Sequence, residues 1–232
     1  MFERYTICSE KEIIEERFSI EINHAFKQIY NAAPSMLLPV IVMDQPTGLS
    51  TCYWGQPPGW TKKKSISEKL ISVRSELIPQ KPVFQKKLKN KRCLVPADGL
   101  YLWKKIGKKS AIPYRYILQN NDIFSMAGIW EDFEDEGGKS MHTFMLVTVP
   151  SKGKLQNFTD RLPMMLTREA EQMWLKSNAL EEELLKPSNQ IAQKDFEMYS
   201  VSPRVNSVEN NEASLILPAP PADQFGNLSL FD

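Results

Sequence analysis

The side chains able to do chemistry are few, and their spacing argues against a metal centre. The three cysteines, Cys8, Cys52 and Cys93, show no C-x-x-C spacing, and the sequence holds only two histidines. A structural zinc site needs four Cys or His ligands at short, regular spacings. We therefore predict reduced thiols, with neither a metal nor a cofactor.

Positive charge is concentrated in one part of the chain. Between Lys62 and Lys109 there are fifteen Lys or Arg residues against three acidic ones, although the net charge of the whole chain is only +1. Such an uneven distribution favours a negatively charged partner, for example a polyanion held in a groove. A solvated surface that keeps the protein soluble is the alternative.

One stretch in this basic region has the pattern of two strands joined by a turn, and we expect the rest of the chain to be organised around it. It is KRCLVPADGLYLWK, Lys91–Lys104, in which Cys93–Val95 and Leu100–Trp103 are apolar runs typical of strands. Pro96–Gly99 lies between them and has the composition of a turn. We therefore expect a hairpin in the core with lysines at its base.

The rest of the pattern predicts the elements that must position such a site. Helices are expected at Ser9–Phe18 and Thr167–Leu175, with Ser9 and Thr167 as N-caps, and a short one at Glu181–Leu185. Short strands are expected at residues 37–43, 50–54, 114–118, 123–130, 141–149 and 198–201. Many short strands with a few peripheral helices indicate an α+β domain on a mainly antiparallel sheet.

The ends of the chain carry two further expectations. The start has no apolar stretch typical of a signal peptide, and no run approaches the ~20 apolar residues of a membrane helix, so we expect a cytoplasmic protein. Residues 1–217 are expected to form one domain. Residues 218–232 are expected to form a proline-rich linker and a tail that projects from it.

Seven sequence blocks, in order and spread over nearly the whole chain, carry a family resemblance. They are YNAAP (30–34), WGQPPGW (54–60), VRSE (73–76), KRCLVPADGLYLWKK (91–105), MAGIWE (126–131), TDRLPMML (159–166) and VSPRVNSVENNEASLI (201–216). Together they resemble the SOS-response-associated peptidase (SRAP) family, the abasic-site processing proteins.

This resemblance implies a fold, a ligand and a reaction. The fold is a single domain around a barrel-like antiparallel sheet, and the ligand is single-stranded DNA in a positively charged cleft. In typical members an N-terminal cysteine, exposed by removal of the initiator methionine, condenses with the aldehyde of an abasic site. An asparagine, a glutamate and a histidine assist, and the same nucleophile is thought to cleave a leader peptide. A role in the DNA damage response follows.

The chain departs from this chemistry at the positions that matter most. Phe2 stands where the family has its cysteine, Leu102 where it has the glutamate, and Thr159 where it has the histidine. None of these side chains can attack an aldehyde or exchange a proton near neutral pH. A family asparagine is replaced by Ser72, whereas Asn31 is retained. We therefore expect no catalytic residue.

The candidate DNA-binding residues are those that the family resemblance retains. Arginine suits phosphate because its planar fork donates two hydrogen bonds, and tryptophan can stack on bases. Structural ion pairs for the arginines, and a core position for one of the two tryptophans, are the alternatives. The candidates are Arg4, Asn31, Trp54, Trp60, Arg74 and Arg161.

The C-terminal segment carries a separate motif. Asn227–Phe231, NLSLF, is similar to the pentapeptide by which bacterial repair and replication proteins dock on the DNA polymerase sliding clamp. Leu228, Leu230 and Phe231 would enter an apolar pocket on the clamp. A tail whose leucines fold back onto the domain is the alternative.

Three functions therefore compete. The first is a catalytically disabled SRAP protein that binds single-stranded or abasic-site DNA without a covalent bond, in association with the nucleoid. The second is an enzyme that forms the covalent adduct through another nucleophile, such as Cys8, a lysine or the amine of Met1. The third is a module whose purpose is clamp binding.

Overall fold

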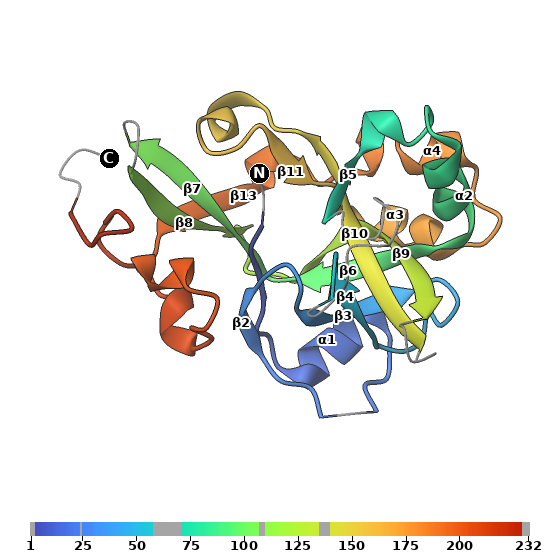
Figure 1. Cartoon of the computed structure of the whole chain (residues 1–232), viewed down its shortest axis with the longest axis horizontal. Coiled ribbons are helices and arrows are strands. Elements are labelled where there is room, and N and C mark those ends of the chain that lie inside the picture. Colours follow the sequence, from blue (N-terminus) through green and yellow to red (C-terminus); the bar gives the residue numbers. More distant parts are fainter. Residues whose placement is uncertain (1–2, 24, 58–70, 107–109, 135–139, 229–232) are drawn as a thin grey trace.

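The computed structural model describes residues 3–23, 25–57, 71–106, 110–134 and 140–228, and everything below refers to these residues. Its strands form two sheets that meet near the middle of the molecule (Figure 1). The barrel sheet dominates one half, and the smaller sheet extends from it toward the C-terminal segment.

Five strands of the larger sheet close on themselves as a barrel. They pair in the ring order β10-β4-β3-β6-β9, and β9 returns to β10. Every pair in the ring is antiparallel except β4 with β10. The mainly antiparallel, barrel-like sheet expected from the sequence is thus confirmed. The strands are β3 (Leu37–Val42), β4 (Ser50–Trp54), β6 (Arg92–Ala97), β9 (Phe124–Glu134) and β10 (Ser140–Pro150).

Short strands extend the rim of the barrel. β5 (Ser72–Arg74) and β11 (Arg161–Pro163) both pair with the end of β10, and β12 (Met165–Leu166) pairs with β9. The last residues of β10 therefore lie between β5 and β11.

The smaller sheet is antiparallel throughout, in the order β13-β8-β7-β1-β2. One of its faces supplies Leu100, Leu102 and Tyr116 to the main core, which fills the barrel. The opposite face carries Tyr101, which packs in a second cluster with Val205 and other residues of the C-terminal segment. The strands are β1 (Tyr5–Ile7), β2 (Ile29–Ala32), β7 (Gly99–Ile106), β8 (Ser110–Leu118) and β13 (Phe196–Ser200).

The predicted central hairpin is wrong. β6 and β7 are both strands, but β6 pairs with β3 and β9 in the barrel, whereas β7 pairs with β1 and β8 in the smaller sheet. The chain crosses from one sheet to the other at Asp98, whose N–H donates to the Thr6 carbonyl. A local turn composition therefore marks a change of sheet.

Within the described residues, four α-helices lie outside the barrel: α1 (Lys11–Phe18), α2 (Pro82–Asn90), α3 (Arg168–Leu175) and α4 (Glu181–Leu184). The Thr167 hydroxyl accepts a hydrogen bond from the Ala170 N–H, so the predicted N-cap of α3 is confirmed. Ser9 does not cap α1, because the helix begins at Lys11 and Glu10 occupies the N-cap position without a side-chain cap bond. The Ser9 N–H and hydroxyl donate to Asp98.

Arg92 joins two helices to the barrel. Its side chain is buried, and it donates to the carbonyls of Leu88 and Lys89 in α2 and of Trp174 and Lys176 at the end of α3. The last carbonyls of a helix lack partners within the helix and carry negative partial charge. A single buried cation thus satisfies the ends of both helices.

The proline-rich segment after Leu217 lies against the domain, which corrects the expectation that it projects. Pro218 bridges to Val201, and the Ala219 N–H and carbonyl bond to Ser200. Ala222 and Asp223 are buried. The prolines extend the chain along β13, where few backbone donors are needed.

Among the described helices, none combines the length and the apolar character needed to cross a membrane.

Candidate functional site

The start of the chain runs beside β7. Tyr5 lies opposite Leu100, and the Tyr101 N–H donates to the Arg4 carbonyl at 3.1 Å. Glu3 and Arg4 therefore continue along β7 in the direction of Leu102. Phe2, which is predicted to stand at the family's nucleophile position, lies outside the described residues.

Leu102 and Thr159, which are predicted to stand at catalytic positions of the family, are linked through aromatic rings. Leu102 is only 2% exposed and lies opposite Tyr114 on β8. The Tyr114 and Phe158 rings pack in a T-shaped arrangement with centroids 5.2 Å apart, and Thr159 follows Phe158 in the chain. The Thr159 hydroxyl donates to the Arg161 carbonyl at 2.9 Å and closes a turn. Leu102 therefore contributes only a hydrocarbon side chain, and the Thr159 hydroxyl is hydrogen-bonded to a backbone carbonyl.

Asn31 serves the structure of the C-terminal segment. It is fully buried in β2, and its amide nitrogen donates to the carbonyls of Val205, Ser207 and Asn210 at 3.2, 2.9 and 3.1 Å. Within the described residues its Oδ1 has no hydrogen-bond partner. The expected role of Asn31 in binding DNA is therefore corrected, because its side chain has no exposed surface.

Of the two candidate tryptophans, the structure describes only Trp54. Trp54 is fully buried, packs against Tyr5 and Phe144, and donates from Nε1 to the Ile71 carbonyl at 2.8 Å. It fills the barrel and cannot stack on a base, so the core alternative is correct for Trp54. Trp60 lies outside the described residues.

The three candidate arginines lie in different environments. Burial lowers the pKa of Arg4, whose Nη1 donates to the Glu3 carbonyl. Arg161 forms an ion pair with Glu76, which is the structural alternative to a role in DNA binding. Arg74 is exposed at the end of β5, and no described residue forms a hydrogen bond or ion pair with its side chain. Arg74 is thus the candidate whose guanidinium is available to a phosphate.

Other parts of the basic stretch have structural partners. Lys87 pairs with Glu131, Lys91 pairs with Asp132, and Arg92 is buried at the helix ends. The lysines at residues 62–64, 69, 108 and 109 lie outside the described residues. The excess of positive charge therefore overstates the number of cations free to meet a polyanion.

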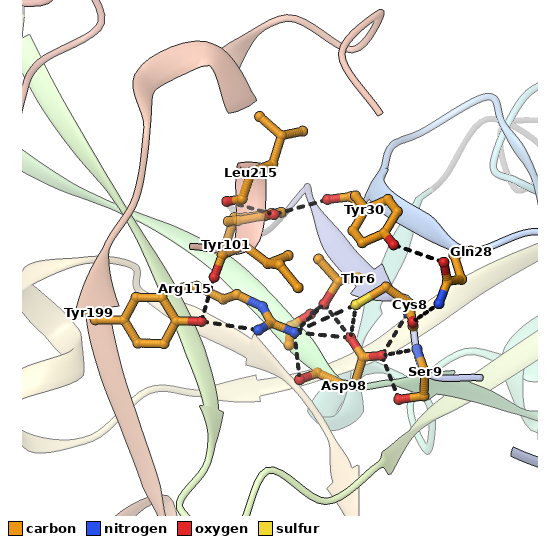
Figure 2. A network of polar contacts seen from close by, with 12 residues as sticks. Thr6, Cys8, Ser9, Gln28, Tyr30, Asp98, Tyr101, Arg115, Tyr199 and Leu215 are labelled. Carbon is orange, nitrogen blue, oxygen red and sulfur yellow. Dashed lines mark hydrogen bonds and ion pairs between the residues drawn. The ribbon is translucent and has the colours of Figure 1, made fainter. Parts of the chain in front are cut away.

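A buried polar network lies where the two sheets meet, and Asp98 is its centre (Figure 2). The Asp98 carboxylate accepts from the Thr6 hydroxyl at 2.5 Å, from the Cys8 N–H at 2.6 Å and from the Ser9 N–H at 2.8 Å. Arg115 Nη2 approaches the same carboxylate at 3.1 Å. Charge is tolerated in such a buried place because it is paired and hydrogen-bonded.

Gly99 allows Arg115 to reach Asp98. A Cβ at Gly99 would lie 2.6 Å from Arg115 Nε, which is too close for any other residue. Arg115 also donates to the Tyr199 hydroxyl at 3.0 Å, which in turn donates to the Ile216 carbonyl. The network therefore ties the first strand to the C-terminal segment.

Sequence reasoning missed this network. The sequence pattern predicts a turn at Asp98 and an apolar strand around Arg115, and neither prediction indicates that the two side chains meet. The signal was present, because a charged residue within the run Tyr114–Leu118 must find a partner when that strand is buried. The sequence could not identify which carboxylate that partner is.

Cys8 belongs to this network and is a poor nucleophile. Its thiol lies 3.4 Å from Asp98 Oδ1, and burial, followed by the nearby Asp98 charge, raises the pKa of Cys8 to about 12. At neutral pH roughly one thiol in 100,000 is then ionised. The thiolate is the reactive form, so this environment suppresses nucleophilic chemistry.

No three His, Cys, Asp or Glu side chains gather in a metal-binding arrangement within the described residues.

The barrel and the second sheet, which meet at the buried Asp98, form a single α+β fold that is also found in solved structures. A solved structure from Bacteroides thetaiotaomicron superimposes with a TM-score of 0.79, at 22% identity, and covers 93% of this chain and 99% of its own. One from Bordetella bronchiseptica gives a TM-score of 0.70 at 19% identity, over 86% of this chain and 99% of its own.

The family follows from the sequence comparisons. The profile described as SOS response associated peptidase (SRAP) matches residues 1–208, and the chain belongs to this family. It is 34% identical to the abasic site processing protein YoqW of Bacillus subtilis, over 92% of this chain and 97% of YoqW. It is 30% identical to the abasic site processing protein YedK of Escherichia coli, over 82% of this chain and 84% of YedK.

Proposed function

We propose that this protein binds single-stranded DNA, including DNA with an abasic site, without forming a covalent bond. Relatives with high coverage are abasic site processing proteins, which makes such DNA the first ligand to consider. The observation that supports the non-covalent part is the inert environment of Leu102 and Thr159, which are predicted to stand at the family's catalytic positions. Leu102 is buried hydrocarbon, and the Thr159 hydroxyl is held by a backbone carbonyl.

Exposed positive charge near these positions favours retention of a DNA strand. Thr148 on β10 lies opposite Arg74, and Arg161 bonds to both Thr148 and Glu76. The Thr159 hydroxyl donates a hydrogen bond to the backbone carbonyl of Arg161. A strand whose phosphates contact this rim would therefore pass the family's catalytic positions.

An active crosslinking enzyme is the competing function, and Cys8 is the thiol nearest the start of the described chain. Its Sγ faces Asp98, whose oxygens already accept from Thr6, Ser9 and Arg115. With its pKa raised to about 12, chiefly by burial, this thiol is protonated at neutral pH. These features favour the non-covalent function.

Salt-dependent retention tests the proposal. A labelled single strand, with or without a central abasic site, should bind at low salt and dissociate as salt rises. Changing Arg74 to Gln should reduce the slope of log affinity against log salt by about 0.7, because one phosphate contact is lost.

The matched control is Arg168→Gln, which removes an exposed arginine on α3 that pairs with Asp122. This control should leave the slope unchanged. Absence of binding by the unaltered protein at low salt would contradict the proposal.

We also propose that the tail docks on the DNA polymerase sliding clamp. Asp223 is buried, and it accepts from the N–H groups of Phe225 and Asn227, so a bonded turn anchors the tail. Leu228, at the end of this turn, is 67% exposed, as an apolar docking residue must be. Leu230 and Phe231 lie outside the described residues.

Deleting residues 228–232 should abolish binding to purified clamp in a surface plasmon resonance assay. The anchoring turn, including the bond from the Ala111 N–H to Gln224, remains in this variant. Phe225→Ser is the control, because it removes an exposed apolar side chain outside the motif. Equal clamp binding by the truncated and full chains would contradict the proposal.

A further inference from the structure

Two arginines lie on one face of the barrel rim, on either side of the end of β10. Thr148 is opposite Arg74 of β5, and Pro150 is opposite Arg161 of β11. Residues opposite each other share a face of a sheet, and so do alternate residues of one strand. One strand lies between them, and their partners on β10 are two residues apart, so the backbones of Arg74 and Arg161 are about 12 Å apart. Their long side chains can therefore reach one phosphate or two neighbouring ones.

The guanidinium of Arg161 bonds to Thr148 on its inner side and to Glu76 on its outer side. Its Nε donates to Thr148 Oγ1 at 3.1 Å, and its Nη2 donates to the Thr148 carbonyl at 2.7 Å. Its outer edge donates to both carboxylate oxygens of Glu76, from Nη1 at 3.2 Å and from Nη2 at 2.7 Å. This two-pronged arrangement is also the one by which arginine binds phosphate.

The Glu76 side chain can move away from Arg161 into solvent. It lies on the 3-10 turn Ser75–Leu77 directly after β5, and its side chain is 49% exposed. Partial burial would raise the pKa of Glu76, but hydrogen bonds from Arg161 outweigh that effect and lower it, so the carboxylate is charged at neutral pH. Exposed ion pairs contribute little net stability, so displacing the carboxylate costs little.

We propose that Glu76 is an internal competitor for a phosphate group at Arg161. When a phosphodiester takes the place of the Glu76 carboxylate, Arg161 and Arg74 form a two-arginine phosphate site on the barrel rim. The inference rests on the proposed function, which it deepens by naming a residue that limits the affinity for DNA. Arg74, Arg161 and Glu76 together carry one net positive charge, and the two arginines alone carry two.

Removing the charge of Glu76 tests this inference. Glu76→Gln should bind a labelled oligothymidylate at low salt about fivefold more tightly than the unaltered protein, the upper range expected when an exposed ion pair is broken. Adding Arg161→Gln to this variant should abolish the gain. Thermal unfolding of the variant checks that the fold is intact.

Glu183→Gln is the matched control. Glu183 is another partly exposed glutamate in an ion pair, and this pair with Lys186 lies at α4, away from the barrel rim. It should change affinity by less than about twofold, as expected for a remote, screened charge. Competition with inorganic phosphate separates the two sources of the ligand. Weak competition indicates a site that recognises the phosphodiester strand, and strong competition one that recognises any phosphate.

The possible failures are distinguishable. If the unaltered protein binds oligothymidylate and Glu76→Gln binds it no more tightly, the inference is wrong and the proposed function stands. If the unaltered protein does not bind but Glu76→Gln does, the proposed function is wrong for the native chain and the competitor role stands. If neither binds, both are wrong.

Discussion

Replacing Asp98 with alanine is expected to lower the free energy of unfolding by about 4 kcal/mol. The change removes the acceptor for Thr6, Cys8 and Ser9, and it leaves the cation of Arg115 buried without its carboxylate. Urea unfolding followed by tryptophan fluorescence measures the loss.

Two further variants identify the cause. Asp122→Ala removes an exposed carboxylate that pairs with Arg168, and it should cost less than about 1 kcal/mol. Adding Arg115→Met to Asp98→Ala should recover part of the stability, because no unpaired charge then remains buried. If Asp98→Ala costs no more than Asp122→Ala, the network does not hold the two sheets together.

Changing Arg92 to methionine should lower the free energy of unfolding by about 3 kcal/mol. Methionine fills similar space but leaves the carbonyls at the ends of α2 and α3 without their shared donor. Burial lowers the pKa of Arg92, so the charge is kept at a cost that these carbonyls must offset. The same urea experiment measures the effect.

Arg168→Met is the control for Arg92, because it makes the same change at an exposed site on α3. It should be nearly neutral. Amide hydrogen exchange should also show faster exchange in α2 and α3 of Arg92→Met, since both helices lose an end contact. Unchanged exchange in these helices would contradict the helix-joining role of Arg92.

Elements whose signals are local could be predicted from the sequence. Ser50–Trp54 is a strand with the predicted bounds, and Thr167 caps α3 as expected. Both depend on residues within one turn or one strand, where side-chain preference decides the structure. The α+β class followed from the number of such strands.

Contacts between distant segments could not be predicted in the same way. PADG at residues 96–99 has the composition of a hairpin turn, but β6 and β7 find partners in different sheets. Ser9 is a residue type that favours helix caps, but its N–H and hydroxyl bond to Asp98, 89 residues along the chain, and the helix begins after Glu10. In each case a tertiary partner outcompeted the local preference.

The candidate site was predicted in part. The family blocks predict inert side chains at the catalytic positions, which stays a prediction, and the aromatic contact of Tyr114 with Phe158 links two of these residues. Residue type alone could not distinguish Trp54 in the core from a base-stacking tryptophan, nor Arg161 in an ion pair from the exposed Arg74. Exposure and partners decide these roles, and both are properties of the fold.

The central claim is that the protein holds abasic-site DNA without bonding to it. The direct measurement incubates the protein with a labelled single strand carrying one abasic site, reduces half with borohydride, and compares native with denaturing gels. A lyase that forms a Schiff base is the positive control for trapping. We expect a shifted band on the native gel and only free strand on the denaturing gel, with and without borohydride. A protein-linked band that survives denaturation would contradict the account.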